Sequence, residues 1–312
     1  MIVVDRVTWL RTILRWHGSA LQKVWRRVLF STALATAVTV TYQYHDTMFH
    51  EALTPLPFTL IGVALGILLG FRNNASYDRF WEGRKLWGGM VNTTRTMTRQ
   101  VLTLVGPQEP DEESIATRKA LVYRVIAYSH AVRKHLRDDR DFEELRPFLP
   151  ESELLKLQHE LNPPIAILQR MGDEFRRCWN LGWVHPMHFP ALEATLTEFT
   201  NLQGGCERIK STPIPFSFNI LLHRIVAVYC VTLPIGIIDQ VGVGTPAVVA
   251  MVSYAFFGLD AVGEEIENPF GLDANDLPLS AITRMIEVNL RQRLHETELP
   301  PLLKPDRQDV LT

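Results

Sequence analysis

The residues best suited to bind a metal lie in one short stretch, GEEIENPFGLDANDLP, at positions 263 to 278. Asp273 and Asp276 stand three residues apart there, beside Asn268 and Asn275. Hard cations such as Ca²⁺ take carboxylate and carbonyl oxygens from compact loops of this type. Asp276 also precedes Pro278, so its side chain could cap a helix that begins near this proline. Two interpretations therefore stay open, a calcium site and a helix cap, and the cap is favoured.

Two pairs of histidines are weaker candidates for metal binding. His185 and His188 occupy the sequence HPMH, and His45 and His50 lie between two apolar segments. Neither pair has carboxylate or cysteine residues at a metal-site spacing, so surface histidines are the simpler interpretation. The sequence also has no Ser-His-Asp order, P-loop or glycine-rich nucleotide turn. We therefore predict that the protein is not an enzyme and carries no cofactor, with calcium as a doubtful exception.

The composition indicates a protein that is partly in a membrane and partly in water. The 312 residues are 46% hydrophobic and 21% charged, and the mean hydropathy is +0.02. The net charge of −2 gives no basic field that would favour nucleic acid. Cys178, Cys206 and Cys230 have no metal-type pair spacing, which favours reduced thiols in a cytoplasmic compartment.

Four apolar runs are candidate transmembrane helices, at about 28–42, 57–71, 225–238 and 246–259. They are shorter than the roughly 20 residues that a lone spanning helix needs, so core helices of a soluble protein are the alternative. The loops HDTMFHEALTPL and DQVGVGT contain no Lys or Arg, whereas basic residues flank the other ends of the first three runs and an acidic stretch follows the fourth. The positive-inside rule then places both termini and residues 72–212 in the cytoplasm.

The second run has two parallel stripes of residues at a spacing of four. Val63, Ile67 and Phe71 form an apolar stripe along one helix face, and Gly62, Gly66 and Gly70 form the stripe beside it. Glycines at this spacing let helices approach closely. From the residues alone, two interpretations are open: packing inside one subunit, or close packing between subunits around a shared axis.

The helix is expected to continue into the cytoplasm, because a cluster of charges follows Phe71 directly. We expect solvated basic residues, paired with Asp78 and Glu82 at helical spacings: Arg72, Arg79, Arg84 and Lys85. Asn73, Asn74 and Ser76 are expected to face water. Arg224, at the start of the third run, is expected to reach the cytoplasmic interface.

The region between the second and third runs is predicted to be helical. Residues 114–136 have apolar positions at spacings of three and four, which is typical of an amphipathic helix. Pro163 and Pro164 separate two further helices, another runs over about 190–209, and Pro213 and Pro215 end it. The tail after Pro300 is expected to be disordered or loosely held.

Two motifs resemble the signature regions of the bestrophins: LGFRNNASYDRFWE at 69–82 and ENPFGLDANDLP at 267–278. The resemblance covers about residues 5–295 and is greatest to the bacterial members. It implies a homopentameric ion channel whose second span lines one axial pore, and it puts Val63, Ile67 and Phe71 at the positions of the pore neck. In calcium-gated animal members a denser acidic run binds Ca²⁺. Here Asp273 and Asp276 keep two carboxylates of that run.

The predicted fold is an all-α membrane protein, a bestrophin-like homopentamer with four transmembrane helices per subunit and a helical cytoplasmic region. Its segments are 1–104, 105–212, 213–262 and 263–312, in one integrated domain. We expect a multi-pass protein of the bacterial inner membrane that conducts monovalent ions. Asp46, Glu51 and Asp239 in the outer loops slightly favour cations, whereas the animal relatives conduct chloride. A membrane-anchored transporter or enzyme is the alternative.

Overall fold

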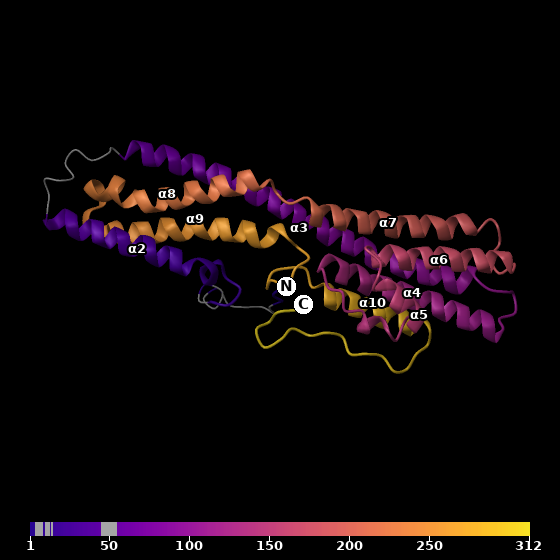
Figure 1. Ribbon diagram of the computed structural model, residues 1–312. Helices are drawn as coiled ribbons and strands as arrows, with labels where there is room; N and C mark the ends of the chain where they lie inside the picture. Colours follow the sequence, from indigo (N-terminus) through magenta and orange to yellow (C-terminus); the bar gives the residue numbers. More distant parts are fainter. Residues whose placement is uncertain (4–8, 10–12, 14, 45–54) are drawn as a thin grey trace. The chain divides into compact units, whose positions relative to one another are not determined.

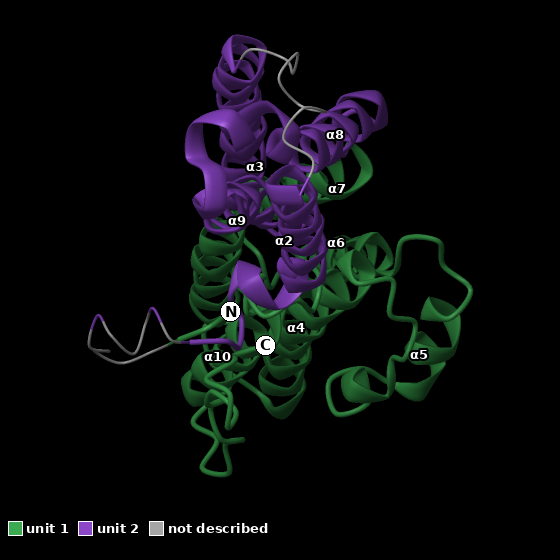
Figure 2. Cartoon of the chain, turned by 90° about the vertical axis from the view of Figure 1, so that its left-hand side faces the viewer, with its two compact units in different colours: residues 1–3, 81–212, 270–312 green, residues 4–80, 213–269 purple. Residues whose placement is uncertain are grey.

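The computed structural model describes residues 1–3, 9, 13, 15–44 and 55–312, and these residues form two compact units (Figure 2). Unit 2 contains residues 4–80 and 213–269, and unit 1 contains residues 1–3, 81–212 and 270–312. The regular structure of the described residues is helical, apart from an isolated antiparallel bridge between Ile2 and Val310. The all-α fold class is therefore confirmed, whereas the division into segments at 104, 212 and 262 stays a prediction.

Unit 2 is built from helices α2 (Ala20–Tyr44), α8 (Phe216–Val241) and α9 (Thr245–Glu267), and from the first half of α3 (Leu56–Leu104). Helices α2, α8 and α9 pack along one another (Figure 1). The core that these helices share with α3 includes the fully buried side chains of Val24, Leu65, Leu69, Leu222, Val226 and Val249. Each of the four predicted apolar runs lies inside one of these helices.

Two helical stretches among the described residues are long and apolar enough to cross a membrane. One is α3, Leu56–Leu104, and the other is Phe216–Glu267, which contains both α8 and α9 joined by the short 3-10 helix Gly242–Gly244. These stretches include the second, third and fourth predicted runs. The first run lies in α2. The number of four spans per subunit stays a prediction.

Unit 1 combines the second half of α3 with five further helices: α4 (Glu112–Leu136), α5 (Glu151–Leu157), α6 (Pro163–Asn180), α7 (Phe189–Ser211) and α10 (Leu279–Arg293). The N-cap Asp111 accepts a hydrogen bond from the Ser114 backbone, which fixes the start of α4. Pro163 occupies the first position of α6, where its missing N–H costs nothing. The predicted helices at 114–136 and 190–209 are confirmed.

The C-terminal half of α4 is more buried than an amphipathic helix should be. It packs against α6, α7 and α10, and it buries His130, Arg133 and Lys134 along with its apolar residues. The carboxylate of Glu144 lies beside His130 and accepts a hydrogen bond from Arg133. Burial raises the pKa of Glu144, but His130 and Arg133 outweigh burial and lower the pKa to about 2. The buried charges of α4 are thus compensated inside unit 1.

The prediction of a loose C-terminal tail is wrong. The ammonium of Met1 donates to the Leu311 carbonyl over 2.5 Å, and the Leu311 N–H donates to the Met1 carbonyl over 2.8 Å. The Ala281 N–H of α10 donates to the carbonyl of Thr312 over 2.8 Å. Hydrogen bonds from the first residues and from α10 therefore fix the tail, and its prolines and charges do not reveal such distant partners.

Candidate pore surface and its charge cluster

The first half of α3 exposes its apolar stripe. Val63, Ile67 and Phe71 are 61%, 55% and 65% exposed, although all three are large apolar residues. Leu65 and Leu69, on the opposite face of the same helix, are 1% and 0% exposed in the core of unit 2. The stripe therefore points away from the core of its own subunit. An uncovered apolar surface of this kind is typical of an interaction surface or a surface outside bulk water.

The glycine stripe divides into two parts. A Cβ atom at Gly62 would lie 2.7 Å from the hydroxyl oxygen of Tyr229, so Gly62 allows close packing of α3 against α8 inside the subunit. A Cβ at Gly66 or Gly70 would meet no heavy atom within 4 Å. Packing inside one subunit thus accounts for Gly62. Gly66 and Gly70 instead leave a smooth open strip beside the apolar stripe.

The prediction that Arg72 is solvated is wrong. Its residue surface is 1% exposed, and its Nη1 donates to Asp260 Oδ1 over 2.5 Å and to the Asp260 carbonyl over 3.2 Å. The Nε and Nη2 atoms of Arg72 are buried without a hydrogen-bond partner. Sequence spacing could not reveal this pair, because its two members lie 188 residues apart. Arg72 thus joins α3 to α9.

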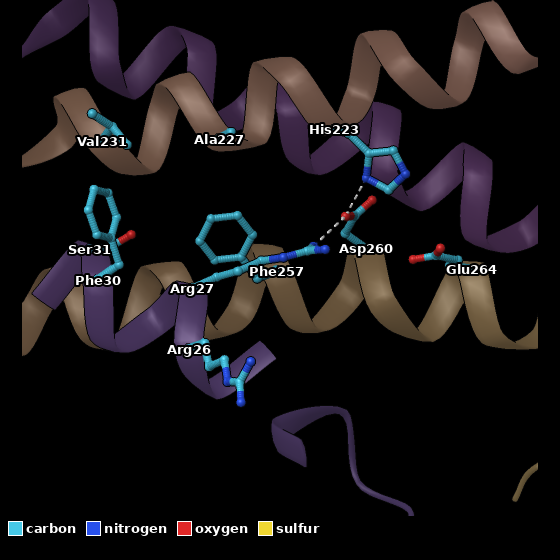
Figure 3. A pocket seen from close by; sticks show the side chains of 10 residues that line it. All are labelled: Arg26, Arg27, Phe30, Ser31, His223, Ala227, Val231, Phe257, Asp260 and Glu264. Carbon is cyan, nitrogen blue, oxygen red and sulfur yellow. Dashed lines mark hydrogen bonds and ion pairs between the residues drawn. The ribbon is translucent and has the colours of Figure 1, made fainter. Parts of the chain in front are cut away.

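Asp260 is the centre of a cluster of basic side chains (Figure 3). His223 Nδ1 lies 2.7 Å from Asp260 Oδ2, and Arg27 Nη1 lies 3.8 Å from the same oxygen. A carboxylate that is 1% exposed needs such compensation, because burial of an unpaired charge is costly. Neither Asp260 nor His223 is among the residues predicted for a site. The available signal was a lone aspartate directly after an apolar run, which calls for a partner.

Two polar residues after Arg72 also face the protein rather than water. Asn73 donates to the Leu259 carbonyl over 3.1 Å, and Ser76 is 0% exposed. Only Asn74 of the expected trio is exposed. Farther along, Arg79 donates to the Glu267 carbonyl over 3.0 Å, and Glu82 pairs with Arg208 over 2.5 Å. These partners come from distant helices and replace pairing within α3.

The predicted helix cap at Asp276 is wrong. Helix α10 begins at Leu279, its N-cap residue is Pro278, and no side chain caps it. Asp276 Oδ2 instead accepts a hydrogen bond from the Asp273 backbone N–H over 2.7 Å, which closes the loop on itself. Among the described residues, no group of three or more His, Cys, Asp or Glu side chains is placed to hold a metal. A calcium role for Asp273 and Asp276 stays a prediction.

The structure describes only some of the remaining candidate residues. The rings of His185 and His188 are 5.5 Å apart at an exposed pocket of unit 1, and His185 Nδ1 accepts from the Met187 N–H. Arg224 is exposed on α8. His45, His50, Asp46 and Glu51 lie outside the described residues. Asp239 is exposed near the end of α8.

The long apolar helices of unit 2, together with the polar helices of unit 1, are typical of a helical membrane protein. The model of the family "Bacterial/Fungal Bestrophin protein" matches residues 1–292. The chain therefore belongs to the bacterial bestrophin family, as its two motifs predicted. This is a channel-forming family and not one of enzymes.

Curated relatives and solved structures agree with this assignment. The chain is 37% identical to voltage-dependent anion channel-forming protein YneE of Salmonella typhi, over all of both chains, and equally similar to the Escherichia coli (strain K12) protein of that name. The crystal structure of a bacterial Bestrophin homolog from Klebsiella pneumoniae matches with a TM-score of 0.81 at 33% identity. The match covers 88% of this chain and 100% of that chain.

Proposed function

We propose that five copies of this chain form an ion channel in the bacterial inner membrane, with α3 lining an axial pore. The observation that carries the proposal is the exposed stripe of Val63, Ile67 and Phe71, opposite the buried Leu65 and Leu69. In a pentamer the stripe would form three stacked apolar rings, the neck of the pore. Rings narrow enough to exclude water gate ion flow by dewetting.

The glycine strip supports the same arrangement. Gly66 and Gly70 meet nothing within their own subunit, so a neighbouring helix can approach the backbone of α3 closely there. The buried pair of Arg72 with Asp260 directly follows Phe71, and it anchors the inner end of the neck to α9. The neck side chains are thereby oriented by a rigid helix rather than by a loop.

The orientation follows from the distribution of charge. One end of unit 2 contains the start of α2, with Arg26 and Arg27, and the start of α8, with Arg224. The last turns of α9, with Asp260 and Glu264, lie at this same end. By the positive-inside rule this end faces the cytoplasm, as do both termini.

The permeant ion is monovalent, and its charge is set outside the neck, because the neck contains no fixed charge. The names of the relatives, anion channel-forming proteins, support chloride and similar anions. The acidic outer residues Asp46, Glu51 and Asp239 favour cations instead. Reversal potentials of the reconstituted protein in asymmetric NaCl decide between the two.

Planar-bilayer recording of Ile67→Ala tests the neck. Truncating the middle ring in every subunit widens the dry stretch, so we expect a higher open probability or conductance with unchanged selectivity between cations and anions. Ile61→Ala is the matched control, because Ile61 is 46% exposed on a different face, beside Phe58 and Tyr229. An equal effect at Ile61 would show that the stripe does not line the pore. Slow uptake without discrete current steps would indicate a transporter.

A further inference from the structure

A pocket of about 520 Å³ opens within unit 2 between α2, α8 and α9 (Figure 3). Its volume is in the range of about 300–1,000 Å³ that holds small organic ligands. One end carries ionisable side chains from all three helices, and the other end is apolar apart from one hydroxyl group. The ionisable end has Arg26, Arg27, His223, Asp260 and Glu264, and the other has Phe30, Ser31, Ala227, Val231 and Phe257.

The charges at the ionisable end are only partly neutralised by one another. Asp260 is already held by Arg72 over 2.5 Å and by His223 over 2.7 Å, so Arg27, at 3.8 Å, is its most distant partner. Arg26 lies over the ring of Trp25 and has no carboxylate partner in the described part of the chain. Glu264 is exposed one helical turn beyond Asp260 and has no basic partner among those residues. Two arginines and one separate carboxylate thus remain for a ligand.

The other end of the pocket can accept hydrocarbon. Phe30, Val231 and Phe257 line it, and they lie toward the centres of the apolar helices that carry them. The hydroxyl of Ser31 is buried there without a hydrogen-bond partner. A soluble anion would use only the arginines and leave this surface uncovered. A phospholipid has the matching polarity, with a phosphate at one end and acyl chains at the other.

We propose that this pocket binds a phospholipid whose headgroup carries a primary ammonium, as in phosphatidylethanolamine. Arg26 and Arg27 bind the phosphate through charge-assisted hydrogen bonds. Glu264 lies farther toward the helix ends and accepts from the ammonium, and the first acyl carbons pack on Phe30 and Val231. An anionic headgroup such as phosphatidylglycerol has no ammonium, so it would leave the Glu264 carboxylate without a positive partner. The proposal does not depend on the pore.

Native mass spectrometry of the full chain, purified in detergent, tests the site with lipids of identical acyl chains. We expect phosphatidylethanolamine to bind about tenfold more tightly than phosphatidylglycerol, since one charged hydrogen bond contributes about 1.5 kcal/mol or more. Phosphatidylcholine, whose quaternary ammonium donates no hydrogen bond, should resemble phosphatidylglycerol. Glu264→Gln should remove the preference and retain phospholipid binding. Arg26→Gln, at an exposed side chain, should weaken all three lipids about tenfold.

Arg224→Gln is the matched control, because Arg224 lies at the same end of unit 2 but borders a different pocket. It should leave lipid binding unchanged. An equal loss in Arg224→Gln and Arg26→Gln would mean that any arginine at the membrane surface binds these lipids, which overturns the proposal. Equal or tighter binding of phosphatidylglycerol to the unmodified protein would also overturn it, as would an unchanged preference in Glu264→Gln.

Discussion

The two halves of α3 bury similar surfaces but expose opposite ones. From Leu56 to Phe80 the helix buries leucines in unit 2 and exposes Val63, Ile67 and Phe71. From Trp81 to Leu104 it buries apolar residues in unit 1 and exposes basic ones. The buried set of the second half includes Trp87, Met90, Met97 and Val101, and the exposed set includes Arg84, Lys85, Arg95 and Arg99.

The outer surface therefore tells more about the surroundings of the helix than its core does. Both halves have a fully buried apolar face, which any packed helix needs. The second half has an outer face of basic residues that water solvates well. The first half, as far as Phe71, is expected to meet lipid, a neighbouring subunit or a narrow pore, and the first exposed polar side chain after Phe71 is Asn74 because Arg72 is buried.

The largest expected effect comes from a bulky residue in the open glycine strip. Gly66→Leu should abolish the proposed pentamer, because its side chain would occupy the surface where a neighbouring helix approaches. The subunit itself should still fold, since a Cβ at Gly66 would meet no heavy atom of another described element within 4 Å. Light scattering of the detergent-purified protein gives the oligomeric state, and circular dichroism gives the helix content.

The matched control is Gly89→Leu in the second half of the helix. A Cβ at Gly89 would lie 2.7 Å from Leu202 Cδ2, so this variant should destabilise the fold of unit 1 instead. Retention of the oligomer in Gly66→Leu would contradict packing between subunits at this strip. Unmodified protein that is folded and monomeric would contradict the pentamer itself.

The two halves of α3 also contain ion pairs of equal length that differ in burial. Arg72 and Asp260 lie 2.5 Å apart with side chains 0% and 1% exposed, and Arg208 and Glu82 lie 2.5 Å apart with side chains 67% and 45% exposed. Removal of one partner from a buried pair leaves an uncompensated charge, whereas water solvates the remaining partner of an exposed pair. Burial of the pair, rather than the distance between its atoms, should decide how much free energy of unfolding is lost when one partner is removed.

Asp260→Ala should lower the free energy of unfolding by about 3–5 kcal/mol, because it leaves Arg72 buried and unpaired. Asp260→Asn should cost less, because the amide oxygen can still accept from Arg72. Unfolding in detergent, followed by circular dichroism, measures both changes. A loss below about 1 kcal/mol in the alanine variant would indicate that water reaches Arg72, and that its side chain does not anchor α3 to α9.

Much of the fold follows from local sequence patterns, and most of the charge cluster does not. Apolar runs, prolines and the Asp111 cap depend on neighbouring residues, so the helices and their ends were predictable. Arg72 was expected in water because its partner Asp260 lies 188 residues away in the chain. Asp276 was expected at a helix cap, and it accepts instead from the backbone N–H of Asp273, so two local hydrogen bonds competed and the sequence did not distinguish them.

For the stripe on α3, the sequence pattern predicts the shared helix face correctly but does not determine what that face contacts. Spacing put Val63, Ile67 and Phe71 on one face, and the structure exposes all three. Whether that face lines a pore depends on other subunits, which a single sequence does not specify. The glycines had the same ambiguity, since Gly62 packs on Tyr229 and Gly66 contacts nothing. The spacing of four residues between the glycines does not distinguish a contact inside the subunit from an open helix face.

The smallest expected effect completes the comparison of the two ion pairs. Glu82→Gln removes the charge from an exposed pair in the second half of α3, and it should lower the free energy of unfolding by less than about 1 kcal/mol. Both side chains are solvated in the native state, so Arg208 loses little stabilising interaction when the carboxylate of Glu82 is neutralised.

The same unfolding measurement at about 0.1 and about 1 M NaCl supplies the second criterion, because charges interact over about 10 Å at the lower salt concentration and over about 3 Å at the higher one. The small difference between Glu82→Gln and the unmodified protein should disappear at high salt, whereas the loss in Asp260→Ala should persist. A cost above about 3 kcal/mol at Glu82, insensitive to salt, would mean that this surface is covered by another subunit and that the second half of α3 is not simply in water.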